Sequence, residues 1–507
     1  MRNLIEDALR SHGADYVEIR IEDAARTKIT LRGRSTDELS VSRSTGGCVR
    51  ALAGGGWGFV SFNDIAGLKD HVALAVSQAR LVSQANGDSL LAPVEPVADT
   101  VVPRLAVDPR SINLEAKQSL LQEYSQIMLG ASPKIQTTTV RYRDTYSKKV
   151  FASSEGAFIE QEQCDVGASC TAIAREGDNV QQMFIVAGGI DGYQSVQGQH
   201  DRARECARRA VLNLDAAPVK AGQYTVVLDP AMAGTFVHEA FGHLSESDFI
   251  YENDTLRDMM VLGRQFGPPI LSITDGAAAP GRRGSYRYDD EGVPASLTPL
   301  IRDGVLIGRL HSRETAGTMG ELPTGNARAI SYRLRPIVRM TNTYIENGST
   351  TLAEMISDID EGIYAIDAYG GETAMEMFTF SAMEAFMIRK GKVAERVRNV
   401  VLTGNVFETL MHIDAVGNDL HMSDGGTGGC GRGQQYPLVG RIGHQVMDPR
   451  VCIYDDPTRD WALGTHLRRP CPRRTPIPAA SDEHGRRRSP YAEASFPCSA
   501  SAMMPSK

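Results

Sequence analysis

The stretch from residue 224 to residue 243 constrains the fold of this chain more than any other. Residues 224–228 have the apolar composition of a buried strand. Asp229-Pro230 follows directly and is a strong helix start, because Asp accepts hydrogen bonds from the free amides of the first turn and Pro fits the first helical position. Apolar residues at helical spacing then continue to Ala240. The sequence therefore predicts a strand that leads straight into a helix.

The predicted helix ends in a group of polar residues that is typical of a metal site. His238, Glu239 and His243 fall within six residues. Zinc in catalytic sites is bound by imidazoles and thiolates, and a neighbouring carboxylate can take a proton from a water molecule on the metal. A chance pair of histidines beside a surface glutamate is the competing interpretation, because short motifs also arise by coincidence.

The spacing of the two histidines requires an irregular helix. Side chains five residues apart on a regular α-helix point about 140° apart, at about 100° per residue. His238 and His243 have this spacing, so a regular helix would not direct both to one metal. Gly242 immediately precedes the second histidine. We therefore expect the helix to end or bulge at this glycine, whose backbone is the least restricted of any residue.

A further candidate ligand lies in the glycine-rich segment 425–433, which contains Cys430. A phosphate-binding loop would end in Gly-Lys-Ser or Gly-Lys-Thr and lead into a helix, and this segment does neither. A flexible linker with an inert cysteine is another possibility. We favour a third interpretation, in which the glycine backbone of this segment approaches a metal closely and Cys430 presents one thiolate to it. Catalytic zinc sites that combine histidines with a cysteine are known.

The alternation of apolar and polar residues predicts an α+β chain of two parts. Residues 1–215 are expected to form an N-terminal α/β-type domain of helices on antiparallel strands. Residues 216–440 are expected to form a mostly antiparallel β domain that carries the helix with the two histidines. The boundary is placed at Ala216, where Ala-Ala-Pro interrupts the patterns. A length of 507 residues agrees with two or three domains.

Residues 441–507 have a different composition from the rest of the chain. Strand patterns fade after Gly440, and clusters of arginine appear among prolines and serines. Such a composition predicts a disordered tail. A shifted reading frame and a genuine extension of the chain would both produce it.

The overall charge argues against broad electrostatic binding to polyanions. The formal net charge is −8 and the pI is about 5.8, whereas nucleic acids and anionic membranes attract basic surfaces. The chain has no run of about 18 apolar residues that could span a bilayer, and its N-terminus lacks the apolar core of a signal peptide. We therefore expect a cytoplasmic protein that binds neither nucleic acid nor membranes.

Several further motifs occur in order along the chain. They lie at residues 13–18, 54–59, 288–294, 323–328, 339–344, 362–364, 417–420 and 430–434. Together with the two histidines, they resemble the TldD/PmbA family of metallopeptidases, on its metal-bearing TldD side. The resemblance extends over about residues 5–440, and chance does not account for so many ordered matches.

The resemblance implies a zinc ion bound by His238, His243 and Cys430, with Glu239 as the general base. It also implies a cytoplasmic dimer that hydrolyses unfolded or short peptides inside a closed chamber. The partner in that dimer would be a second copy of the chain or a PmbA/TldE-like subunit without the metal motif.

The C-terminal segment is where the chain departs from this family, whose members end soon after the glycine-rich loop. An altered segment 441–507 would remove a closing strand, so the alternative is a catalytically inactive subunit that binds peptides or a partner. The four site residues favour the peptidase, because a subunit that only binds needs none of them. A purely structural zinc would need a fourth protein ligand, and none is evident in the sequence.

Overall fold

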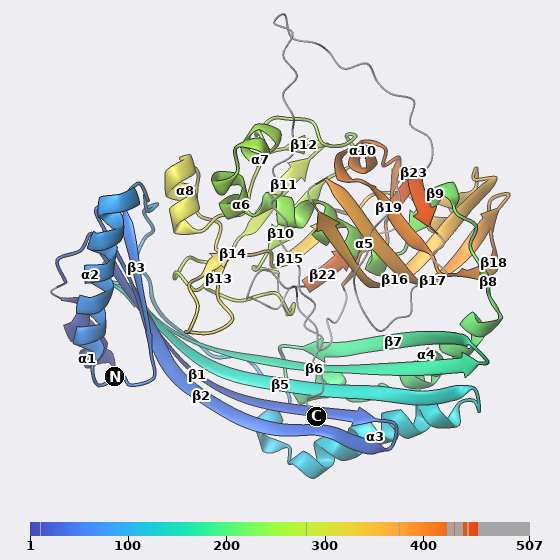
Figure 1. Ribbon diagram of the computed structural model, residues 1–507, viewed down its shortest axis with the longest axis horizontal. Coiled ribbons are helices and arrows are strands. Elements are labelled where there is room, and N and C mark those ends of the chain that lie inside the picture. Colours follow the sequence, from blue (N-terminus) through green and yellow to red (C-terminus); the bar gives the residue numbers. More distant parts are fainter. Residues whose placement is uncertain are drawn as a thin grey trace, which may run out of the picture.

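The chain folds into helices and mostly antiparallel sheets, which confirms the predicted α+β class. The computed structural model describes residues 1–10, 12–279, 281–374, 376–422, 430, 440–443 and 446–454. Within these residues, the first half of the chain forms a seven-stranded sheet, and the second half forms a six-stranded, an eight-stranded and a short two-stranded sheet. Figure 1 shows the first sheet as a curved layer, with the second half of the chain on its concave side.

The seven-stranded sheet has the strand order β3-β2-β1-β5-β6-β4, with β7 paired to β6. Its strands are β1 (Tyr16–Arg32), β2 (Ser35–Ala53), β3 (Gly56–Phe62), β4 (Ala98–Val101), β5 (Ile135–Ser153), β6 (Phe158–Glu176) and β7 (Asn179–Gly189). The helices of this half are α1 (Arg2–Leu9), α2 (Leu68–Asn86), α3 (Leu114–Gly130) and α4 (His200–Asp215). In Figure 1, α3 lies on the convex side of the sheet, and α1 and α2 cover one end of it.

The eight-stranded sheet of the second half contains a ring of strands. Its order is β16-β9-β23-β19-β17-β18-β8, β20 also pairs with β23, and an additional pairing of β16 with β17 closes five of the strands into the ring. The strands are β8 (Ala217–Pro218), β9 (Gly222–Leu228), β16 (Glu361–Ala374), β17 (Met377–Arg389), β18 (Lys392–Arg398), β19 (Val401–Asn405), β20 (Ala415–Val416) and β23 (Val446–Tyr454).

The six-stranded sheet has the order β12-β11-β10-β15-β22-β21, and β13 pairs with β14. These strands are β10 (Ile273–Gly276), β11 (Leu297–Arg302), β12 (Val305–Leu306), β13 (Ala327–Arg328), β14 (Ile337–Val338), β15 (Asn342–Ile345), β21 (His421–Met422) and β22 (Gly440–Gly443). The helices of the second half are α5 (Pro230–Val237), α6 (Ser247–Glu252), α7 (Asp254–Met259), α8 (Arg313–Met319), α9 (Leu352–Ile356) and α10 (Val406–Met411).

Helix α5 is the helix that the sequence predicted, and it lies in the core of the second half. Asp229 caps it by accepting a hydrogen bond from the Met232 amide at 2.8 Å. The Phe236 ring meets the rings of Phe378 and Phe380 of β17 at centroid distances of 5.6 and 5.9 Å. Packing of this kind fixes the position of the helix, and therefore of the residues that follow it.

Strands continue past residue 440. β22 pairs with β15 and β21, and β23 pairs with β9, β19 and β20. Residues 441–443 and 446–454 are thus paired in sheets, and the disordered tail expected for the segment 441–507 stays a prediction. The rest of the segment 441–507 lies outside the described residues. The division of the chain at residue 216 stays a prediction.

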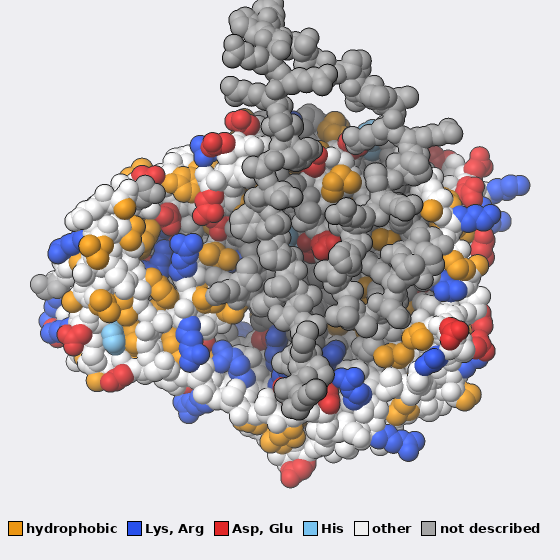
Figure 2. All heavy atoms as spheres, in the orientation of Figure 1, with side chains coloured by type: hydrophobic (Ala, Val, Ile, Leu, Met, Phe, Trp, Pro, Cys, Tyr) orange, Lys and Arg blue, Asp and Glu red, His pale blue; other side chains and the backbone are white. Residues whose placement is uncertain are grey.

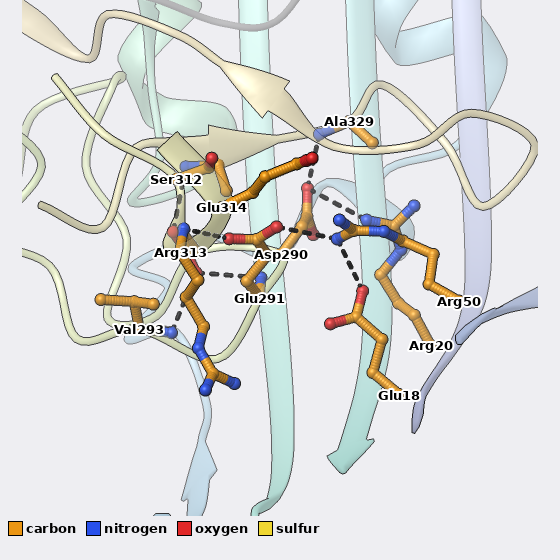
Figure 3. Close-up of polar contacts among 12 residues, drawn as sticks. Glu18, Arg20, Arg50, Asp290, Glu291, Val293, Ser312, Arg313, Glu314 and Ala329 are labelled. Carbon is orange, nitrogen blue, oxygen red and sulfur yellow. Dashed lines mark hydrogen bonds and ion pairs between the residues drawn. The ribbon is translucent and has the colours of Figure 1, made fainter. Parts of the chain in front are cut away.

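A buried set of charged side chains joins the two halves of the chain (Figure 3). Arg50 Nη1 of β2 lies 2.9 Å from Glu18 Oε1 of β1 and 2.8 Å from Glu291 Oε1. Lys149 Nζ of β5 lies 2.8 Å from Asp290 Oδ1. The two acids at 290 and 291 belong to the connection between β10 and β11. The acidic turn of the second half is thus neutralised by cations of the first sheet, which holds the halves in one arrangement.

Replacing Arg50 by alanine should lower the free energy of unfolding by about 3 kcal/mol, because Glu18 and Glu291 would stay buried without the cation they share. Urea unfolding measures the change. Arg389→Ala is the control, since this exposed arginine forms only surface ion pairs and its loss should hardly move the midpoint. Equal effects of the two substitutions would show that the buried set does not hold the halves together.

The visible outer face carries charges of both signs. Figure 2 shows the Lys and Arg side chains interspersed with Asp and Glu over the residues that are drawn in colour. Among the helices that the structure describes, none is both long and apolar enough to cross a membrane.

Candidate metal centre

The helix that carries the two histidines widens instead of ending. After α5, residues His238–Gly242 form a π-helical turn, in which the amide of His243 donates to the carbonyl oxygen of His238. A hydrogen bond between residues five apart places those residues one above the other, as the ordinary bond does for residues four apart. The two imidazole centroids lie 5.1 Å apart, with an angle of 79° between the ring planes. The expected irregularity is present, and it takes the form of a bulge.

Gly242 has a different role from the one that the sequence suggested. Its backbone is right-handed helical, with φ −57° and ψ −48°, so no conformation reserved for glycine is required there. Instead, a Cβ atom at this position would lie 2.0 Å from Met340 Sδ. Met340 is fully buried. Glycine is needed because this side chain packs directly onto the backbone of the π turn.

Gly242→Ala should therefore destabilise the protein by about 1–3 kcal/mol, because either Met340 or the π turn must shift. We also expect weaker metal binding, since the turn sets the position of His243. Thermal unfolding and metal content measure the two effects. Gly130→Ala in α3 is the control, because a Cβ there meets nothing within 4 Å. A variant at 242 that matched this control would show that the close packing has no consequence.

The structure brings the three predicted ligands together. The candidate ligand atoms of His238, His243 and Cys430 all lie within 4.8 Å of one another. Cys430 Sγ is 3.1 Å from His243 Nε2. Two ligands of a tetrahedral zinc are about 3.5 Å apart, given zinc–nitrogen and zinc–sulfur distances of about 2.0–2.3 Å. Small movements would thus suffice for the three atoms to hold one zinc ion, and their chemistry is the kind that zinc prefers.

Glu239 lies on the same side of the π turn as the ligands. Its Oε2 is 3.8 Å from His243 Nε2, the nitrogen that also faces Cys430. The Glu239 side chain is 13% exposed, so it is partly enclosed and still accessible to water. A carboxylate in this place can receive a proton from a water molecule at the site, which is the task of a general base.

The second ring nitrogen of His243 is bound by a residue that the sequence analysis missed. His243 Nδ1 lies 3.1 Å from Oε2 of Glu246, whose side chain is fully buried. Burial opposes a charged imidazole, but Glu246 and Cys430 outweigh it and raise the pKa of His243 to about 10. A metal ion at Nε2 would therefore have to displace a proton. The sequence did hold a signal for this contact. Glu246 follows His243 by three residues, and one helical turn brings side chains at that spacing together.

Protein-family models match most of the chain. They describe PmbA/TldA metallopeptidase domain 1 over residues 17–80, the central domain over 107–214 and the C-terminal domain over 221–435. A metalloprotease of Synechocystis is 48% identical, over 84% of this chain and 91% of that protein. A zinc metalloprotease TldD homolog of Saccharolobus solfataricus is 29% identical, over 82% of this chain and 91% of its own length. The structure of TldE from Thermococcus kodakarensis has the same fold, with a TM-score of 0.70, 18% identity and coverage of 89% and 99% of the two chains.

Proposed function

The chain belongs to the PmbA/TldD family of metallopeptidases, and from this premise we propose that it is a zinc-dependent peptidase. His238, His243 and Cys430 hold the metal in this proposal, and Glu239 is the general base. The observation that carries it is the convergence of the three ligand atoms within 4.8 Å, with the Glu239 carboxylate beside them. The printed name of the Saccharolobus relative supports zinc as the metal.

Three protein ligands are typical of a catalytic site, because a structural zinc has four and a catalytic one keeps a position open. When bound, zinc would polarise the substrate carbonyl and lower the pKa of water. Glu239 takes the proton from the attacking water and passes it to the leaving amine. His243 stays oriented throughout by its bond to Glu246. This chain therefore contributes the ligands, the base and the orientation of one ligand.

We propose that the substrates are unfolded or short peptides, which bind as extended strands in a chamber enclosed by a dimer in the cytoplasm. Backbone hydrogen bonds to such a strand give affinity with little preference for sequence. The partner is a second copy of the chain or a PmbA/TldE-like subunit. The fold shared with TldE supports a partner of the same architecture.

The test is metal content and peptide hydrolysis by the purified full-length chain. We expect about one zinc ion per chain, and cleavage of an unstructured protein that stops on chelation and returns with added zinc. A chain that takes up no zinc on dialysis would refute the proposal. Zinc binding without cleavage, alone or with a PmbA-type subunit added, would favour the catalytically inactive partner instead.

A further inference from the structure

We propose that Glu246 and Arg339 are positioning residues that join two of the metal ligands through a buried ionic link. This inference rests on the proposed zinc site. The side chains of both residues are 0% exposed. Neither residue touches the place where a substrate would react, so each acts through a ligand. They reach the site from different elements, since Glu246 follows the π turn and Arg339 lies between β14 and β15.

The Glu246 carboxylate contacts three residues on two separate segments of the second half. Glu246 Oε2 lies 3.1 Å from His243 Nδ1. Glu246 Oε1 accepts a hydrogen bond from the backbone amide of Met340 at 3.3 Å and lies 3.7 Å from Arg339 Nε. Met340 is also the residue whose side chain packs on Gly242. Glu246 therefore ties His243 to the strand region that shapes the π turn.

Arg339 extends the link to the third ligand. Its Nη2 donates a hydrogen bond to the carbonyl oxygen of Cys430 at 3.2 Å. His243 and Cys430 are 187 residues apart in the sequence. A hydrogen bond to the Cys430 backbone from a fully buried side chain is a direct way to fix the position of the thiolate. The Arg339 guanidinium thus contacts both the Glu246 carboxylate and the backbone of Cys430.

Charge explains why both partners are present. A buried carboxylate is costly unless a cation and hydrogen bonds compensate it. Arg339 supplies that cation, and Glu246 can then accept the Nδ1 proton of His243. An imidazole that donates from Nδ1 binds a metal through Nε2, and this nitrogen is the one 3.1 Å from Cys430 Sγ. The pair therefore selects the tautomer and the orientation that a metal needs.

Glu246→Gln tests the carboxylate. It keeps the size of the side chain but removes the charge, and we expect zinc affinity to fall about 10–100-fold in competition with a chromophoric chelator. Glu321→Gln is a matched control, because Glu321 forms the same kind of trio with His311 and Arg309 outside the proposed ligand set. Its zinc affinity should equal that of the unmodified chain.

Cobalt(II) substitution provides a readout that general destabilisation would not produce. We expect the visible cobalt bands of Glu246→Gln to shift, while the thiolate-to-cobalt charge-transfer band persists. Arg339→Lys keeps a positive charge but cannot serve both Glu246 and Cys430, so it should weaken the charge-transfer band. If Glu246→Gln does not fold, Arg339→Lys tests the proposal in its place.

Two outcomes separate this inference from the proposed function. An unmodified chain that binds no zinc would remove the site itself. An unmodified chain that binds zinc, together with Glu246→Gln and Arg339→Lys variants of equal affinity and identical cobalt spectra, would overturn the positioning role and leave the peptidase proposal intact.

Discussion

Glu239→Gln should lower the rate of peptide hydrolysis by about 10²–10⁴-fold while the zinc content stays the same. The amide keeps the shape of the side chain but cannot accept the proton of the attacking water. The other acid of this turn cannot replace it, because Glu246 is fully buried and bound to the far side of His243. The measurement is kcat on an unstructured protein, with zinc determined on the same samples.

The control for this result is Glu252→Gln, an exposed acid at the end of α6. Its activity should equal that of the unmodified chain. If Glu239→Gln retained full activity with zinc bound, Glu239 would not be the base, and another group would have to take the proton.

The second large effect is expected from Cys430→Ala, which should weaken zinc binding on the order of 10³-fold. The substitution removes one of the three proposed ligands and its negative charge, and two histidines alone hold zinc poorly at neutral pH. Zinc retained after gel filtration measures the loss. Cys206→Ala is the control, because the Cys206 thiol is also buried but donates to the Met183 carbonyl in the first half of the chain. Zinc retained at the full level in Cys430→Ala would exclude this thiolate as a ligand.

Local chemistry allowed much of the candidate site to be predicted from the sequence. Asp229-Pro230 specifies a helix start by itself, and the structure shows the cap in place. The spacing of His238 and His243 predicted an irregular helix, because a regular α-helix does not point side chains five residues apart in the same direction. Cys430 stood out because glycines surround it. Each of these signals lies within a few residues of the feature that it predicts.

The features that the sequence did not reveal depend on contacts between distant segments. The form of the π turn depends on Met340, which packs on Gly242 from nearly 100 residues away. Arg339 belonged to a recognisable motif, but its link to Cys430 exists only in the folded chain. The strands after residue 440 were missed for the same reason. Their pairing is supplied by β9, β15 and β19, not by a strong pattern of their own.

The position of β23 sets the order in which the protein can be completed during synthesis. This strand is the last one described along the chain, yet it lies between β9 and β19 in the closed ring. A polypeptide emerges from the ribosome N-terminus first, so β9 stays without this neighbour until residues 446–454 have emerged. Cys430 leaves the tunnel only shortly before. Nascent chains therefore expose an unfinished strand edge for most of translation, and the proposed zinc site can be completed only at its end.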